Sequence, residues 1–227
     1  MLTFGCEKTN HDQTPTRPKL FVYIGEYMKF NVIFAALGAV IVSHTALADQ
    51  FNNLGIEYGI GGNHQQGTVE FNKTVLPHVY LGAKAGYNDY RQGSNGHEDS
   101  LGFHVGGFMP IGDQGLQVYG ETGYTSVTNH GRAQTLNGRD INFIHTELGL
   151  TGPLDSNMFY KVYGSDNFNI SDHKKVDYRT AFGGEIGYKV ISDLSVNLGL
   201  KHQNTVYQSN VSSDNDDMAY LKAQYMF

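Results

Sequence analysis

The sequence predicts an all-β protein, and three observations lead to this fold class. The 227 residues include 28 Gly, 15 Tyr and 13 Phe, but only 5 Pro and no Trp. A chain rich in glycine and aromatic residues and short of strong helix formers favours strands. Apolar residues also alternate with polar or small ones through most of the chain after residue 52. Polar, turn-forming stretches separate these alternating segments, as expected between strands.

The N-terminal part of the chain is predicted to be an export signal. It has a charged start at Met28-Lys29-Phe30, an apolar run at 32–42 and small residues at Ala46-Leu47-Ala48. The apolar run is shorter than the roughly 20 residues that a membrane-spanning helix needs. We therefore expect residues 28–48 to be a secretory signal peptide, cleaved after Ala48. Residues 1–27 are interpreted as an upstream extension without a fold of its own.

Ten alternating segments follow the predicted cleavage site. In the last of them, Leu221 and Tyr225 share one parity, while Lys222 and Gln224 share the other. This period of two places the apolar set on one face of a strand. The predicted strands are 53–61, 68–75, 79–90, 100–109, 116–126, 140–150, 158–168, 177–191, 194–207 and 218–227. The second and seventh are the weakest, so eight strands remain the alternative.

The connections between these segments are of two alternating kinds. One set is short and turn-like, at 76–78, 110–115, 151–157 and 192–193. The other set is polar and mostly longer, at 62–67, 91–99, 127–139, 169–176 and 208–216. Alternating segments of about ten residues, joined in this manner, are typical of membrane barrels. The sequence predicts that residues 49–227 form a transmembrane antiparallel up-and-down β-barrel, with ten strands favoured.

A resemblance to a known group rests on the segment 28–48, on the alternation across 53–227 and on Tyr225-Met226-Phe227. The chain resembles the small bacterial outer-membrane β-barrel proteins, the broad OmpA/OmpX/opacity-like and porin-like group. In that group a final strand ending in Phe is read by the barrel assembly machinery. The resemblance thus implies that Tyr225 and Phe227 are an assembly signal. It also implies a place in the bacterial outer membrane, with lipid, lipopolysaccharide, the assembly machinery and periplasmic chaperones as partners.

Charged residues on the polar parity are expected to line the barrel lumen. They are Glu57, Glu70, Lys84, Glu121, Glu147, Lys161, Arg179, Glu185, Lys189, Lys201 and Lys222. Charges removed from bulk water must be paired or hydrated. Because acids and bases nearly balance here, we expect a lumen closed by a salt-bridge network, or a narrow wet one. A wide selective pore would carry one dominant sign.

Other chemistries receive little support from the sequence. The net charge of −6 argues against a nucleic-acid partner, and Cys6, the only cysteine, excludes an intramolecular disulfide. His145-Thr146-Glu147 puts an imidazole and a carboxylate on one strand face. With a serine, this pair could resemble the triad of barrel lipases, but no particular serine is singled out. We predict no catalytic residue, no metal and no cofactor.

Histidines recur in the predicted longer connections. His64, His97, His130 and His173 fall one in each of the first four, with acidic residues nearby. A shared external rim of this kind could bind a divalent cation or respond to pH. Polar, solvated loops are the plainer interpretation.

The function predicted from these features is that of a monomeric integral barrel with a structural or surface-interaction role. A narrow porin-like channel for ions or small solutes is the alternative, and a lipid-modifying barrel enzyme is the third hypothesis. A barrel of ten strands lies close to the size at which side chains fill the interior. Any pore is therefore expected to be small.

Overall fold

A computed structural model describes residues 51–62, 64–90, 96–131, 140–171, 176–207 and 213–227. The predicted upstream extension and signal peptide lie outside these described residues. Within the described ranges, no helix is long and apolar enough to cross a bilayer.

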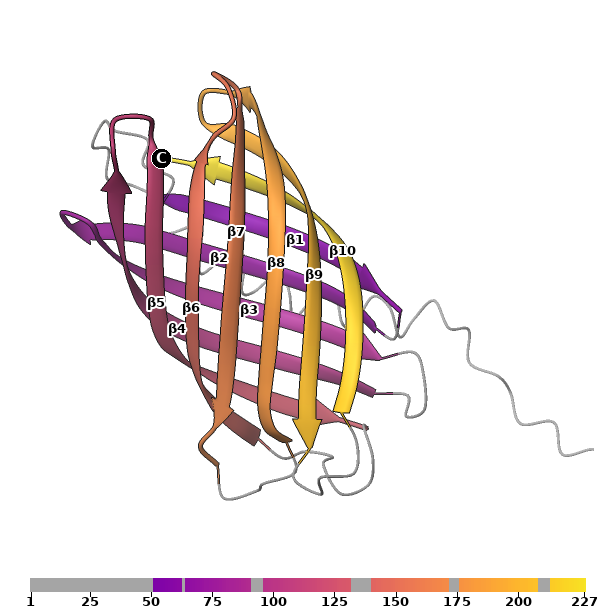
Figure 1. The fold of residues 1–227 in the computed structure, drawn as a ribbon. Helices are drawn as coiled ribbons and strands as arrows, with labels where there is room; N and C mark the ends of the chain where they lie inside the picture. The colour runs from indigo at the N-terminus through magenta and orange to yellow at the C-terminus, as the bar shows by residue number, and fades with distance from the viewer. Residues whose placement is uncertain (1–50, 63, 91–95, 132–139, 172–175, 208–212) are drawn as a thin grey trace, which may run out of the picture. The chain divides into compact units, whose positions relative to one another are not determined.

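The described residues form a closed antiparallel barrel of ten strands, as Figure 1 shows. The strands are β1 (Asn53–Gly61), β2 (His64–Leu76), β3 (Val79–Tyr90), β4 (Gly96–Ile111), β5 (Leu116–His130), β6 (Asp140–Pro153), β7 (Met158–Asn169), β8 (Val176–Ile191), β9 (Leu194–Tyr207) and β10 (Ser213–Met226). Each strand pairs with its neighbours in sequence, and β1 pairs with β10 to close the sheet. The up-and-down topology is therefore confirmed, with ten strands and not eight.

Strand boundaries differ from the prediction mainly at one end of the barrel. β1, β3 and β9 have the expected bounds, but β2 begins at His64, β4 at Gly96 and β10 at Ser213. These added residues are mostly polar, so hydropathy alternation stops while backbone pairing continues. Residues expected in loops therefore lie on strands, where the register fixes which way each one points.

The short connections and the two ends of the sheet lie together. β2–β3, β4–β5, β6–β7 and β8–β9 are joined by short turns, and His78 and Gly115 take positive φ values of 65° and 77° in two of them. The amide of Phe227 donates to the carbonyl of Asn52, 3.0 Å away, and the amide of Met226 to that of Asp193, 2.7 Å away. We call this the turn end of the barrel, and the opposite end the loop end.

The outer wall of the barrel is apolar. Large side chains on it remain 49–70% exposed: Leu81, Leu101, Phe103, Leu148, Phe182, Leu198, Leu200 and Leu221. An apolar surface of this extent is not stable in water and marks a lipid-facing surface. The closed sheet leaves no unpaired strand edge inside the hydrocarbon region, which is the condition for a sheet to span a bilayer. The barrel is thus of the transmembrane type.

Tyrosines cover the inner wall by lying over glycines. Each of four lumen tyrosines faces a glycine directly opposite on the next strand: Tyr80 and Gly106, Tyr119 and Gly149, Tyr163 and Gly183, Tyr220 and Gly199. A Cβ atom added at Gly183 would lie 2.7 Å from the Tyr163 ring, so only glycine leaves room for the flat ring. This pairing accounts for part of the high glycine and tyrosine content.

Candidate functional site in the barrel lumen

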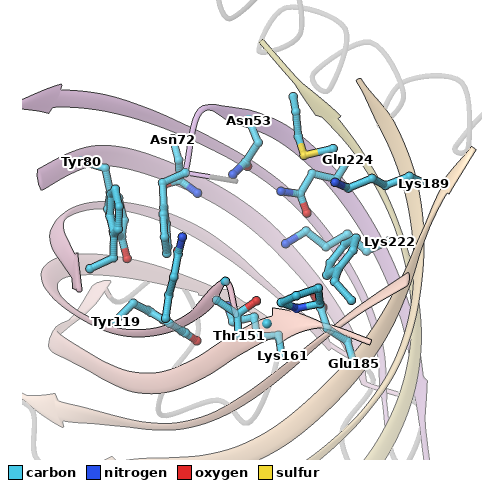
Figure 2. A pocket seen from close by; sticks show the side chains of 18 of the residues that line it. Asn53, Asn72, Tyr80, Tyr119, Thr151, Lys161, Glu185, Lys189, Lys222 and Gln224 are labelled. Carbon is cyan, nitrogen blue, oxygen red and sulfur yellow. The ribbon is translucent and has the colours of Figure 1, made fainter. Parts of the chain in front are cut away.

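The lumen holds two cavities arranged along the barrel. A cavity of about 530 Å³ lies toward the turn end and is lined by residues such as Phe51, Tyr80, Phe108 and Lys189. A second cavity, of about 180 Å³, lies toward the loop end and includes Phe143 and Arg179 in its lining. Figure 2 shows side chains from several strands pointing into the larger one. All eleven charged residues predicted to face the lumen line one or both of these cavities.

Five charged residues line both cavities and so lie where the two cavities adjoin. We call them the central ring: Glu70, Glu121, Lys161, Glu185 and Lys222. The Lys222 ammonium lies 3.5 Å from a carboxylate oxygen of Glu70. Lys161 lies 3.0 Å from Glu147, just beyond the ring. Three acids and two bases therefore meet where the two cavities adjoin.

Tyrosine hydroxyls complete the bonding of these carboxylates. Tyr80 donates to Glu121 at 2.8 Å, and Tyr220 donates to Glu185 at 3.1 Å. Tyr119 donates to Glu147 at 2.6 Å. The sequence indicated that tyrosines would fill the lumen but gave no signal for these partners, because each bond joins different strands.

Two of the acids lie directly opposite each other. Glu121 on β5 pairs in register with Glu147 on β6, an arrangement that is destabilising for like charges. His145 Nε2 lies 3.3 Å from Glu121, and His104 Nε2 lies 3.7 Å from it. Two imidazoles therefore lie beside the Glu121 carboxylate. The Glu147 carboxylate contacts the Lys161 ammonium and accepts a hydrogen bond from the Tyr119 hydroxyl. Glu121, His145 and Glu147 also bring ligand atoms within 4.8 Å of one another, close enough for a metal ion.

The structure gives His145 a different partner from the one the sequence suggested. Its Nδ1 lies 3.1 Å from Asn167 Oδ1, and its Nε2 lies 3.3 Å from Glu121 Oε1. Both ring nitrogens thus face an amide or a carboxylate. In a hydrolytic triad one nitrogen faces the serine nucleophile. The His145–Glu147 pairing considered for a barrel lipase is therefore not the contact that His145 makes.

An apolar cluster lies on the inner wall of β5, β6 and β8 toward the loop end of the lumen. Val127, Ile141, Phe143 and Val176 pack together and are 1–4% exposed. The Arg179 guanidinium lies 5.3 Å from the centre of the Phe143 ring. We call these four apolar residues the loop-end cluster.

A buried ion pair lies beside this cluster. Arg179 on β8 contacts Glu98 on β4 at 3.0 Å, and Tyr90 donates to the same carboxylate at 2.9 Å. Three strands separate β4 from β8 in one direction and five in the other, so the pair crosses the lumen. Glu98 is 1% exposed, although the sequence prediction placed it in a loop. Counting back from His104 in steps of two, through residues 102 and 100, reaches Glu98 and would have predicted its inward position.

The four predicted rim histidines do not share one rim. His64 opens β2, is buried, and its ring contacts Asp216 inside the barrel, where the amide of Gly62 also donates to Asp216 at 2.9 Å. His97 and His130 lie on the outward parity of β4 and β5. His173 lies outside the described residues.

Among the described residues, buried polar atoms without a hydrogen-bond partner occur toward the turn end and also, at Asn129, toward the loop end. Ser195 and Asn197 are fully buried in the wall. Within the described part of the chain, Ser195 Oγ and Asn197 Oδ1 have no hydrogen-bond partner. Buried polar atoms of this kind are normally satisfied by water.

Phe51, which precedes β1, stacks on Tyr80 with ring centres 4.7 Å apart, and on Phe108 at 4.5 Å.

The last residues of β10 and the residue after it contact the outer wall. The Phe227 ring stacks near Phe71 with centres 5.8 Å apart, and Lys73 Nζ lies 5.1 Å above it. Tyr225 is exposed on the outer face and lies 6.5 Å from the Phe227 ring. These aromatics lie where β1 and β10 close the barrel.

Comparisons with known proteins concern the fold class only. No protein-family model matches the chain, and no curated protein matches it. An outer membrane channel from Pseudomonas putida F1 has a similar structure, with a TM-score of 0.49 and 10% identity over 77% of this chain and 95% of that chain. The NanC porin has a TM-score of 0.48 and 7% identity, over 77% of this chain and 100% of that chain. A KdgM porin has a TM-score of 0.43 and 8% identity, over 77% of this chain and 99% of that chain. We base the fold on the strand pairing, and no functional argument on these likenesses.

Proposed function

We propose that this chain is an integral bacterial outer-membrane barrel, closed at rest, with a structural or surface-interaction role. The observation that carries this proposal is that side chains meet across the lumen toward its loop end. There the loop-end cluster packs on the inner wall, and the Glu98–Arg179 pair crosses the lumen at 3.0 Å. A solute would have to displace both to pass.

The location and partners are part of the same proposal. The exposed apolar belt suits membrane lipid, with lipopolysaccharide around its outer part. Tyr225 and Phe227 are exposed or half-buried aromatics beside the seam between β1 and β10. That position suits contact with the barrel assembly machinery while the sheet closes. The closed barrel has no open edge to pair with another copy, and we infer a monomer.

A narrow channel for ions or small solutes is the second candidate. The two cavities favour it, because they meet at the central ring and together follow much of the lumen. Hydrated charges of both signs would let small ions enter from the turn end. The loop-end cluster is then the barrier that would have to open.

Single-channel recording separates the two candidates. We expect the purified, folded barrel to be silent in planar bilayers, because the loop-end cluster blocks ion passage. Phe143→Ala removes the largest member of that cluster and is expected to produce small conductance steps. Phe182→Ala is the matched control, since that ring is 65% exposed on the lipid side of β8.

The recordings can also contradict the proposal. Large, stable conductance from the unsubstituted barrel would make the channel the leading function. Equal conductance from the Phe143 and Phe182 variants would show that the loop-end cluster is not the barrier. Heat-shifted gel mobility of each variant checks that its barrel is folded.

A further inference from the structure

Three metal-ligating side chains lie together on the outer face of β4 and β5, near the loop end. His97 on β4 lies directly opposite His130 on β5, and Asp99 is two residues along the same face of β4. His97 and Asp99 have the same parity on β4 as Leu101, which is 52% exposed on the outer wall. His130 has the same parity on β5 as Tyr124, which is 42% exposed there. The three side chains therefore point away from the lumen, beyond the apolar belt.

The geometry of these three groups is close to that of a metal site. The two imidazole rings are stacked, with centres 4.7 Å apart and planes 23° apart. His130 Nε2 lies 3.3 Å from Asp99 Oδ2. Ligand atoms from the three residues all lie within 4.8 Å of one another.

We propose that His97, Asp99 and His130 bind a divalent transition metal, with zinc as the ion that fits best. Two imidazole nitrogens and one carboxylate oxygen form a ligand set that zinc accepts, whereas calcium and magnesium prefer oxygen. With bonds of about 2.0–2.1 Å, tetrahedral zinc holds its ligand atoms ~3.3 Å apart. The His130 and Asp99 side chains are 43% and 56% exposed, so small side-chain rotations bring them to that distance. The fourth position is left to water.

Neighbouring residues support the proposed ligands. The Tyr87 ring lies 5.3 Å from the His97 ring. Asp89 on β3 is directly opposite His97 and can orient its second ring nitrogen, as carboxylates do for metal-bound histidines. Thr128 is opposite Asp99 and donates to Asp140 at 2.6 Å. These carboxylates also make the surroundings negative, which favours a cation.

Another histidine on the outer face provides a matched control. His202 on β9 contacts Asp217 on β10 at 2.7 Å, and both are on the outward parity. This pair offers one imidazole and one carboxylate, against the two imidazoles and one carboxylate of the proposed site. Of these two histidine–aspartate contacts on described outer-wall residues, the proposal therefore predicts zinc binding at the His130–Asp99 contact alone. It is independent of whether the lumen conducts.

The experiment uses the folded barrel in detergent, prepared without a polyhistidine tag and stripped of metal. Zinc is titrated in competition with a chromophoric chelator. We expect one zinc per barrel, with affinity reduced at least about tenfold by His97→Asn or by His130→Asn. His202→Asn should bind as the unsubstituted protein does. X-ray absorption of the zinc-loaded barrel should show two imidazole ligands.

Several results would overturn the site. One is unchanged affinity in both the His97 and the His130 variants. Another is an equal loss in the His202 variant. An X-ray absorption spectrum that shows fewer than two imidazole ligands on zinc would also overturn the site. If His145→Asn alone abolished binding, the metal would lie in the lumen beside Glu121, and the surface site would be wrong. Heat-shifted mobility of every variant shows that lost binding does not come from lost folding.

Discussion

The two ends of the lumen are built on the same alternation but are closed to different degrees. At the loop end, the inward positions of β5, β6 and β8 carry Val127, Phe143 and other apolar side chains. At the turn end, the inward positions carry lysines, glutamates and amides around a cavity of about 530 Å³. We therefore expect the apolar end to be dry and the polar end to be wet, although the same strands run through both.

An inward parity therefore does not by itself decide whether an ion pair is buried. Glu98 and Arg179, in the dry end, are 1% and 12% exposed as side chains. Glu70 and Lys222, in the central ring, are 21% and 10% exposed, and they line both cavities. The cost of breaking a pair should follow the access of water. Single substitutions at the two ends of the lumen measure that relation.

Glu98→Ala should have the largest effect. It removes the carboxylate that lies 3.0 Å from the Arg179 guanidinium beside the Phe143 ring, at a place where the Glu98 side chain is 1% exposed. Breaking a buried pair in this manner costs about 3–5 kcal/mol of unfolding free energy. Urea-induced unfolding of the barrel in lipid vesicles measures it. The Glu98→Ala/Arg179→Ala double variant should recover part of the loss, because it removes the guanidinium as well. A loss as small as that of a surface pair would show that the loop end is hydrated.

Phe51→Ala tests the turn end and should have an intermediate effect. The ring stacks on Tyr80 and Phe108, but it also borders the larger cavity. We expect a loss of about 1.5–3 kcal/mol, the value for burying one large apolar side chain. Phe143→Ala, in the dry end, should cost more, about 3–5 kcal/mol. Equal losses in the same unfolding assay would mean that the two ends are packed alike.

Lys222→Met should have the smallest effect on stability. Water from both cavities reaches Glu70 after the substitution, and Asn72 still donates to Glu70 at 2.9 Å. The expected loss is below about 1 kcal/mol, as for solvated ion pairs. Arg179→Met is the matched substitution at the dry end, and it should cost several times more. If Lys222→Met and Arg179→Met lower the free energy of unfolding by the same amount, the central ring is as dry as the loop end.

The architecture could be predicted closely because it depends on a local pattern. A period of two in hydropathy, as in Leu54, Ile56 and Ile60, fixes which face of each strand meets lipid. The inward position of charges such as Lys161 follows from the same rule. Strand ends were predicted less well, because near His64 and Glu98 the outward residues are no longer apolar while the strand continues.

Ten alternating segments, their inward and outward faces, and the near balance of charge inside could be read from the sequence, with eight strands left as the alternative. The folded barrel settles the number at ten and shows which charges meet. Closure of the sheet brings Glu98 opposite Arg179 across the lumen, and register puts Glu121 against Glu147 and His97 against His130. The physical reason is that hydropathy records only whether a side chain meets lipid. Partners across a barrel depend on shear, register and side-chain reach, which link residues far apart in the chain.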